Sequence, residues 1–181
     1  IQHQVPHPPI TFLFTVREES GLFGARHLDP RVLEGPEFGF NVDGRSAAEI
    51  TLGAVGADRW EVEITGKASH AGVHPEHGIS ASLIAALAMA EVYRGGWFGK
   101  VKKGGREGTS NVGSIRDADG RSAGQATNVV TDFVLLRGES RSHDAAFVRA
   151  ITSAYKTAFK NAAARVKDHR GKTGKVKFTS R

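Results

Sequence analysis

The chain of 181 residues contains 39% hydrophobic and 24% charged residues, and it has no cysteine. This is the composition of an ordinary globular protein, and it excludes disulfides and thiolate metal sites, so any metal would be held by carboxylates and imidazoles. No apolar stretch reaches the length of a membrane span and no signal peptide opens the chain, so we expect a cytoplasmic protein without a membrane partner.

The net charge of +6 is concentrated near the C-terminus. Residues 156–181 contain nine Lys or Arg and one Asp, whereas the rest of the chain has a small acidic excess. A local excess of this kind favours a solvated basic face over a nucleic-acid site.

The first expected element is the apolar and β-branched run from Ile10 to Val16. Such a run predicts a strand buried on both faces of a mostly parallel sheet. Glu18 and Glu19 follow at its carboxyl end, where open α/β sheets place their chemistry. One carboxylate could bind a metal while the other accepts a proton from a water molecule beside it. The alternative is that both carboxylates lie in a solvated loop without a function. The same region predicts a helical turn and two short strands, at 22–28, 38–42 and 49–54.

From Trp60 onward the pattern changes to alternating strands and amphipathic helices. We expect a ferredoxin-like β-α-β-β-α-β order, which is an antiparallel sheet covered on one face by two helices. Ser142 is the expected N-cap of the second helix. The chain would thus consist of a partial α/β domain at 1–58, ending in a linker at 56–59, and a smaller α+β domain at 59–181. The expected strands and helices are 60–65, 79–94, 109–115, 126–136, 147–166 and 175–179.

The segment F-T-V-R-E-E-S-G-L-F-G-A, residues 14–25, resembles the signature of metallopeptidase family M-twenty. These are co-catalytic zinc exopeptidases that include peptidase T, carboxypeptidase G and the aminoacylases. The resemblance implies two zinc ions per active site, with Glu18 as general base and Glu19 as a metal ligand. It also implies that Asp43, in a V-D-G segment, is a ligand of the second metal. Without the resemblance, Asp-Gly would indicate only a turn.

Three later segments are similar to the family in the same order: G-K-A-S-H-A-G, A-T-N-V-V and G-E-S-R-S-H-D. The resemblance implies that His70 donates a hydrogen bond to the scissile carbonyl as charge develops on its oxygen. Asn128 would point its amide at the substrate, and Arg141 would clamp a substrate carboxylate with its planar guanidinium. Read from the residues alone, His70 is a surface residue and Asn128 an edge residue. His74 and His77 match no family position and are expected to be surface residues.

The resemblance therefore implies a tripeptidase-like metallopeptidase, with a lid domain that also forms a homodimer. The alternatives are an N-acyl amino acid amidohydrolase of the same family and a basic nucleic-acid-binding module. The nucleic-acid module is disfavoured because the two central strands contain a single aromatic residue, Phe133. The family's H-x-D motif, its bridging Asp and its last His have no counterpart here, so we expect an internal segment that is inactive by itself.

Overall fold

The computed structural model describes residues 6–19, 21–33, 35–42, 46, 48–120, 123–124 and 126–180. Its contacts divide the chain into two compact units, residues 1–51 and 52–181. Within the described ranges, no helix has both the length and the apolar character needed to cross a membrane. The elements are α1 (Phe23–Arg26), η1 (Pro30–Leu33), β1 (Gly56–Thr65), η2 (Pro75–His77), α2 (Ala81–Arg94), β2 (Gly99–Lys103), β3 (Arg106–Arg116), β4 (Phe133–Ser142), α3 (Ala145–Arg165) and β5 (Lys175–Ser180).

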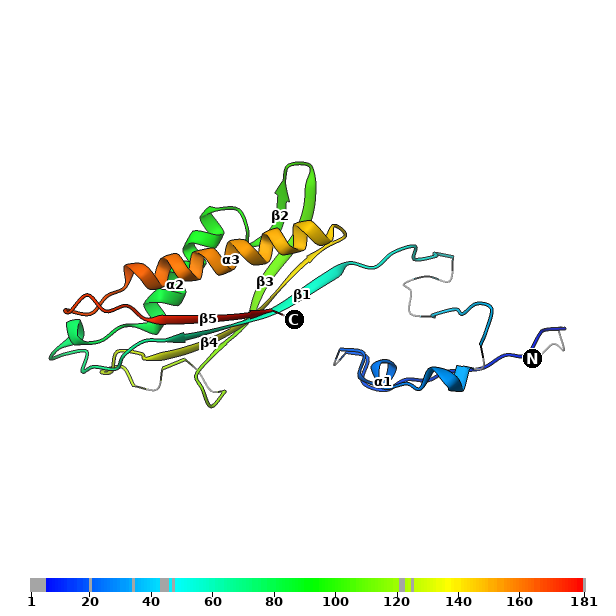
Figure 1. Ribbon diagram of the computed structural model, residues 1–181, viewed down its shortest axis with the longest axis horizontal. Coiled ribbons are helices and arrows are strands. Elements are labelled where there is room, and N and C mark those ends of the chain that lie inside the picture. Colours follow the sequence, from blue (N-terminus) through cyan, green and yellow to red (C-terminus); the bar gives the residue numbers. More distant parts are fainter. Residues whose placement is uncertain are drawn as a thin grey trace. The chain divides into compact units, whose positions relative to one another are not determined.

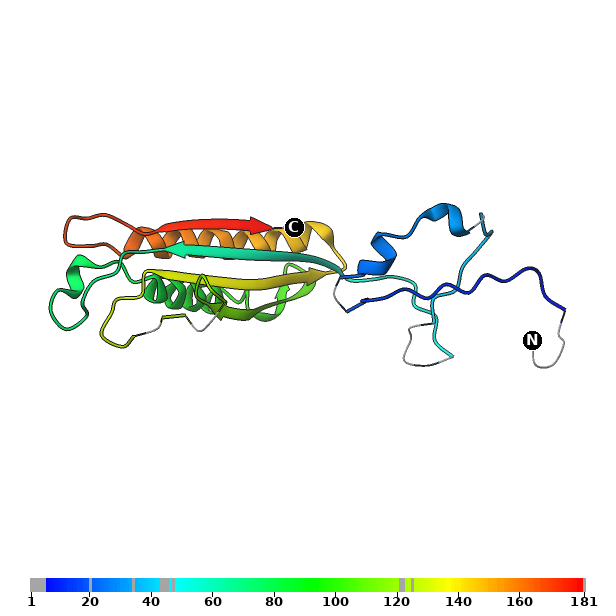
Figure 2. The same ribbon diagram turned by 90° about the horizontal axis from the view of Figure 1, so that it is seen from below.

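The second unit is built on one five-stranded sheet with the order β2-β3-β4-β1-β5. Every neighbouring pair is antiparallel. Helices α2 and α3 pack side by side on one face of this sheet (Figures 1 and 2). The predicted antiparallel sheet with two covering helices is confirmed, and β2 adds one strand at an edge.

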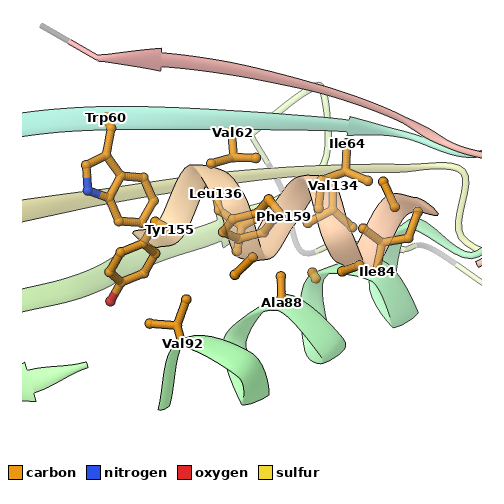
Figure 3. Packing of buried hydrophobic residues seen from close by; sticks show 14 of the residues in the cluster. Trp60, Val62, Ile64, Ile84, Ala88, Val92, Val134, Leu136, Tyr155 and Phe159 are labelled. Carbon is orange, nitrogen blue, oxygen red and sulfur yellow. The ribbon is translucent and has the colours of Figure 1, made fainter. Parts of the chain in front are cut away.

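The core lies between the sheet and the two helices (Figure 3). Along β1, Trp60, Val62 and Ile64 are buried and alternate with the more exposed Glu61 and Glu63. The helices complete the layer with residues spaced three or four apart, as an amphipathic helix requires. Their fully buried members include Ile84, Ala88, Phe147, Ile151, Tyr155 and Phe159.

Strand β2 was not predicted, because the segment G-K-V-K-K contains a single apolar residue, Val101. Gly104 and Gly105, with φ of +56° and +74°, form the tight turn that joins β2 to β3. Strand β4 begins at Phe133 and continues to Ser142, later than the predicted 126–136. The predicted position was wrong because the prediction followed the apolar run and ended with it. The strand continues past Leu136 into charged residues, whose side chains lie on the open face of the sheet.

Two boundaries also differ from the prediction. Residues 56–59 are the start of β1 rather than a linker, because they pair with the far end of β4. Helix α3 is capped by Asp144, whose carboxylate accepts the N–H of Ala146 at 2.8 Å and of Phe147 at 3.1 Å. Ser142, the expected cap, is the last residue of β4 and donates instead to the Glu107 carbonyl at 2.6 Å.

The described residues of the first unit contain no strand, so the expected mostly parallel sheet is not formed there. The apolar run from Ile10 to Val16 is exposed, and 89% of Phe14 is accessible. A strand needs hydrogen-bonded neighbours and a partner surface for its side chains, and this unit supplies neither in its described part. The predicted helical turn is present but shorter, as α1.

Candidate functional site

Glu18 and Glu19 lie in a turn that folds the chain back on itself between Val16 and Gly24. The Gly24 N–H donates to the Val16 carbonyl at 2.9 Å, and the Leu22 N–H donates to the Glu18 carbonyl at 2.8 Å. Both glutamates are exposed. The backbone hydrogen bonds thus fix the turn while the two carboxylates remain available to a ligand.

This turn holds backbone conformations that are uncommon for residues with side chains. Arg17 and Leu22 have φ of +57° and +61°, in the left-handed region. A Cβ at Gly24 would lie 2.6 Å from the Val16 backbone nitrogen, so only glycine fits there. Local strain of this kind is most often retained at functional sites. It marks the turn that carries Glu18 and Glu19 as a candidate site.

The donor set around these carboxylates is only part of a zinc site. A catalytic zinc site uses about three protein ligands plus water. Among the described residues, neither Glu18 nor Glu19 belongs to a group of three His, Asp or Glu side chains that could hold one metal ion. Asp43 lies outside the described residues. Carboxylate oxygens are a ligand type that zinc accepts, but the described part of this chain does not supply enough ligands to complete a site.

In the second unit, His70 and Asn128 lie on neighbouring segments. His70 forms an isolated antiparallel bridge with Val129. The Ala71 N–H donates to the Asn128 carbonyl at 2.8 Å. Both His70 and Asn128 are exposed. The fold therefore places these two predicted substrate-binding residues together at the end of the sheet where β1 finishes and β4 begins.

The orientation of the His70 ring is set by its neighbour Gly72. The Gly72 N–H donates to Nδ1 of His70 at 3.1 Å. Since Nδ1 accepts this hydrogen bond, the neutral ring carries its hydrogen on Nε2. A Cβ at Gly72 would lie 3.4 Å from Cε1 of the ring, so the small residue lets the backbone approach it. Nε2 is thus the hydrogen-bond donor that His70 can offer to a ligand.

Beside the loop that carries His70 lies a buried carboxylate, Asp168, that sequence reasoning did not identify. Asp168 accepts the N–H groups of Arg170 and Lys172, each at 2.9 Å, and lies 3.7 Å from the Lys67 ammonium. The backbone hydrogen bond from Lys172 contributes most to holding the pKa of Asp168 below its ordinary value. The signal in the sequence is that Asp168 is the single acidic residue in the basic segment 156–181.

Arg141 lies at the opposite end of the sheet from His70 and Asn128. Its Nε and Nη2 donate to the two carboxylate oxygens of Glu139, at 2.8 Å and 2.9 Å, which raises the pKa of Arg141. In the β1–β4 register Arg141 faces Ala57, whereas Phe133 faces Thr65. Eight residues of strand span about 26 Å. Within one chain, therefore, Arg141 and His70 do not reach the same small ligand.

Residues 52–167 match the peptidase dimerisation domain family. This range covers the sheet from β1 to β4 and both helices. The chain belongs to this family. The expected family membership is confirmed. The matched range lies within the second unit and includes His70 and Asn128, which lie in loops, and Arg141, which lies in β4.

Relatives of the dimerisation domain include peptidases. The uncharacterized protein YqjE of Bacillus subtilis is 34% identical over 164 residues, which are 90% of this chain and 40% of that protein. A tripeptidase structure from Staphylococcus aureus is 32% identical with a TM-score of 0.77, covering 99% of this chain and 43% of that one. The aminopeptidase PepT structure from Bacillus cereus is 33% identical with a TM-score of 0.68, and the match covers 91% of this chain and 40% of that one. The chain thus spans about two fifths of these relatives' lengths.

Proposed function

We propose that this chain is part of a zinc-dependent exopeptidase of the tripeptidase type. The observation that carries the proposal is that His70 and Asn128 lie on neighbouring paired segments, with Nδ1 of His70 accepting from Gly72 so that Nε2 carries the hydrogen of the neutral ring. The dimerisation-domain match and the likeness to a tripeptidase structure support it. The exposed turn that carries two adjacent carboxylates supports it from the first unit.

Glu18 is the proposed general base, because its exposed carboxylate can accept a proton from a water held beside it. Glu19 and Asp43 are the proposed metal ligands, one for each of two zinc ions. Bound zinc would supply a water acidified towards neutral pH. The remaining ligands would come from parts of the protein outside the described residues, since these residues bring no third ligand to Glu18 and Glu19.

His70 and Asn128 are the proposed donors to the oxygen of the scissile carbonyl. An Nε2–H and a side-chain amide can both point at an oxygen on which negative charge develops. Such donors contribute more in the transition state than in the ground state, and the loss of one typically lowers kcat about 100- to 1000-fold. The hydrogen bond from Gly72 prepares His70 for this role by fixing its tautomer.

Arg141 is the proposed site for the substrate's carboxylate, and its position bears on the assembly. Arg141 lies about 26 Å along β4 from the end of the sheet near His70. Arg141 and His70 of a single chain therefore cannot both contact one tripeptide. Two copies of the chain could do so if Arg141 of one copy and His70 of the other faced the same substrate. We therefore propose a homodimer in which both subunits contribute to each active site.

The test is an assay of the full-length protein on tripeptides and on N-acyl amino acids, with and without a metal chelator. We expect hydrolysis of tripeptides that is lost on chelation and restored by zinc. Hydrolysis of N-acyl amino acids alone would assign the protein to the amidohydrolase alternative. Hydrolysis of tripeptides that resists chelation would contradict the metal-dependent proposal.

A further inference from the structure

A cluster of His74, Glu76 and His77 lies in the loop between β1 and α2 and takes no part in the proposed peptidase chemistry. Nδ1 of His74 is 3.3 Å from Oε1 of Glu76, and Nε2 of His77 is 3.6 Å from the same oxygen. All three potential ligand atoms lie within 4.8 Å of one another. The spacing H-x-E-H concentrates three metal-ligating side chains in one short turn.

The two distances to Oε1 of Glu76 are close to the separation between two ligands of a bound zinc ion. Zn–N and Zn–O bonds of about 2.0–2.2 Å separate two tetrahedral ligands by about 3.3 Å. The His74 and His77 rings are stacked, with centroids 4.7 Å apart and planes 11° apart. A metal lies in the plane of each ring that binds it, so one ring must turn on binding. The His77 ring also packs on the His169 ring, with 4.2 Å between centroids. His74 has the more exposed side chain, at 58% against 44%, and is the ring that can turn.

The backbone of this cluster is fixed before any ligand binds. Within η2, the His77 N–H donates to the His74 carbonyl at 3.1 Å. The Glu76 carbonyl accepts the His169 N–H at 2.8 Å, which fastens η2 to the loop between α3 and β5 (Figure 1). Binding a metal would therefore order three side chains without ordering the main chain, which lowers its entropic cost.

We propose that His74, Glu76 and His77 bind one zinc ion, with an open position left for water. Two imidazoles and one carboxylate form a ligand set of intermediate softness, which suits zinc better than magnesium or calcium, since these two ions prefer oxygen ligands alone. The site would also stabilise the loop that carries His70, since the His74 N–H donates to the His70 carbonyl at 3.0 Å. The proposal does not depend on the peptidase function, because it uses none of the residues assigned to it.

The test is isothermal titration of the full 181-residue chain with zinc chloride, with magnesium chloride as a comparison. We expect one zinc per chain, no heat from magnesium, and at least a tenfold loss of zinc affinity, roughly, in the double variant His74→Ala/His77→Ala. Glu76→Gln keeps the shape of the side chain and should also weaken binding. His143→Ala is the matched control and should retain wild-type affinity, whereas Glu18→Gln/Glu19→Gln tests whether the first unit binds the zinc instead.

Two outcomes would overturn the proposal. The first is wild-type zinc affinity in the double histidine variant with its circular dichroism spectrum unchanged. The second is an absence of zinc binding by the wild-type chain, which would leave the cluster as a contact between two imidazoles and a carboxylate. In the first case, loss of binding in the Glu18→Gln/Glu19→Gln variant would place the zinc at the first unit.

Discussion

Replacement of Gly138 by alanine should destabilise the second unit, because Trp60 lies directly over this position. An added Cβ would overlap the indole ring and lie 2.5 Å from the Asn111 carbonyl oxygen. The ring has little room to move: it is 3% exposed and packs on Tyr155 with 4.6 Å between centroids. Its Nε1 also donates to Ser140 at 3.2 Å, and a displaced indole would lose this bond.

The expected cost follows from these contacts. Overpacking of a close-packed core costs about 1–3 kcal/mol. Loss of the hydrogen bond between Trp60 and Ser140 adds about 1 kcal/mol. The sum of about 2–4 kcal/mol is a large share of the 5–15 kcal/mol typical of a domain. At about 3 °C per kcal/mol for a unit of this size, the Tm should fall by about 6–12 °C.

Thermal unfolding followed by tryptophan fluorescence and circular dichroism measures this difference. Gly113→Ala is the matched control, since a Cβ at this other strand glycine would meet only the Asn111 side chain, at 3.9 Å. The control should unfold within about 2 °C of the wild type, because an unstrained surface change costs little. A Gly138→Ala variant that also unfolded within about 2 °C of the wild type would refute the packing of Trp60 against Gly138.

Three further predictions follow from the cap, the buried carboxylate and the proposed dimer. Asp144→Ala should lower the free energy of unfolding in urea by about 1 kcal/mol, because α3 loses its N-cap, and an unchanged midpoint would mean that another group caps it. The depressed pKa of Asp168 stabilises the fold above about pH 4, and this contribution disappears as the pH falls through the folded-state pKa. Urea curves should therefore show Asp168→Asn less stable than the wild type at pH 7 and equal to it in strong acid, whereas a difference independent of pH would contradict this. Light scattering should give about twice the 19.4 kDa chain mass, and a monomer at about 100 μM would count against the homodimer.

The elements with clear periodicity could be predicted from the sequence. In β1 the alternation of Trp60, Val62 and Ile64 with charged residues matched one buried and one open face. Helix α2 ended at Gly95 as expected, because glycine is a poor helix former. These features depend on neighbours along the chain, and such local signals are visible in the sequence.

Features that depend on distant partners could not be predicted. The run from Ile10 to Val16 has the composition of a buried strand, but burial needs other strands beside it. The ion pair between Asp168 and Lys67 joins two residues that lie far apart in the sequence. The proximity of His70 to Asn128 became visible only through the bridge between His70 and Val129, and their separation from Arg141 only through the register of β1 and β4.

The central claim is that His70 acts on the substrate as a hydrogen-bond donor and holds no metal. The most direct test is the His70→Ala variant of the full-length protein, assayed for tripeptide hydrolysis and analysed for bound zinc. We expect kcat to fall about 100- to 1000-fold while the zinc content stays that of the wild type. Unchanged kcat, or a loss of zinc that accompanies the loss of activity, would contradict the account.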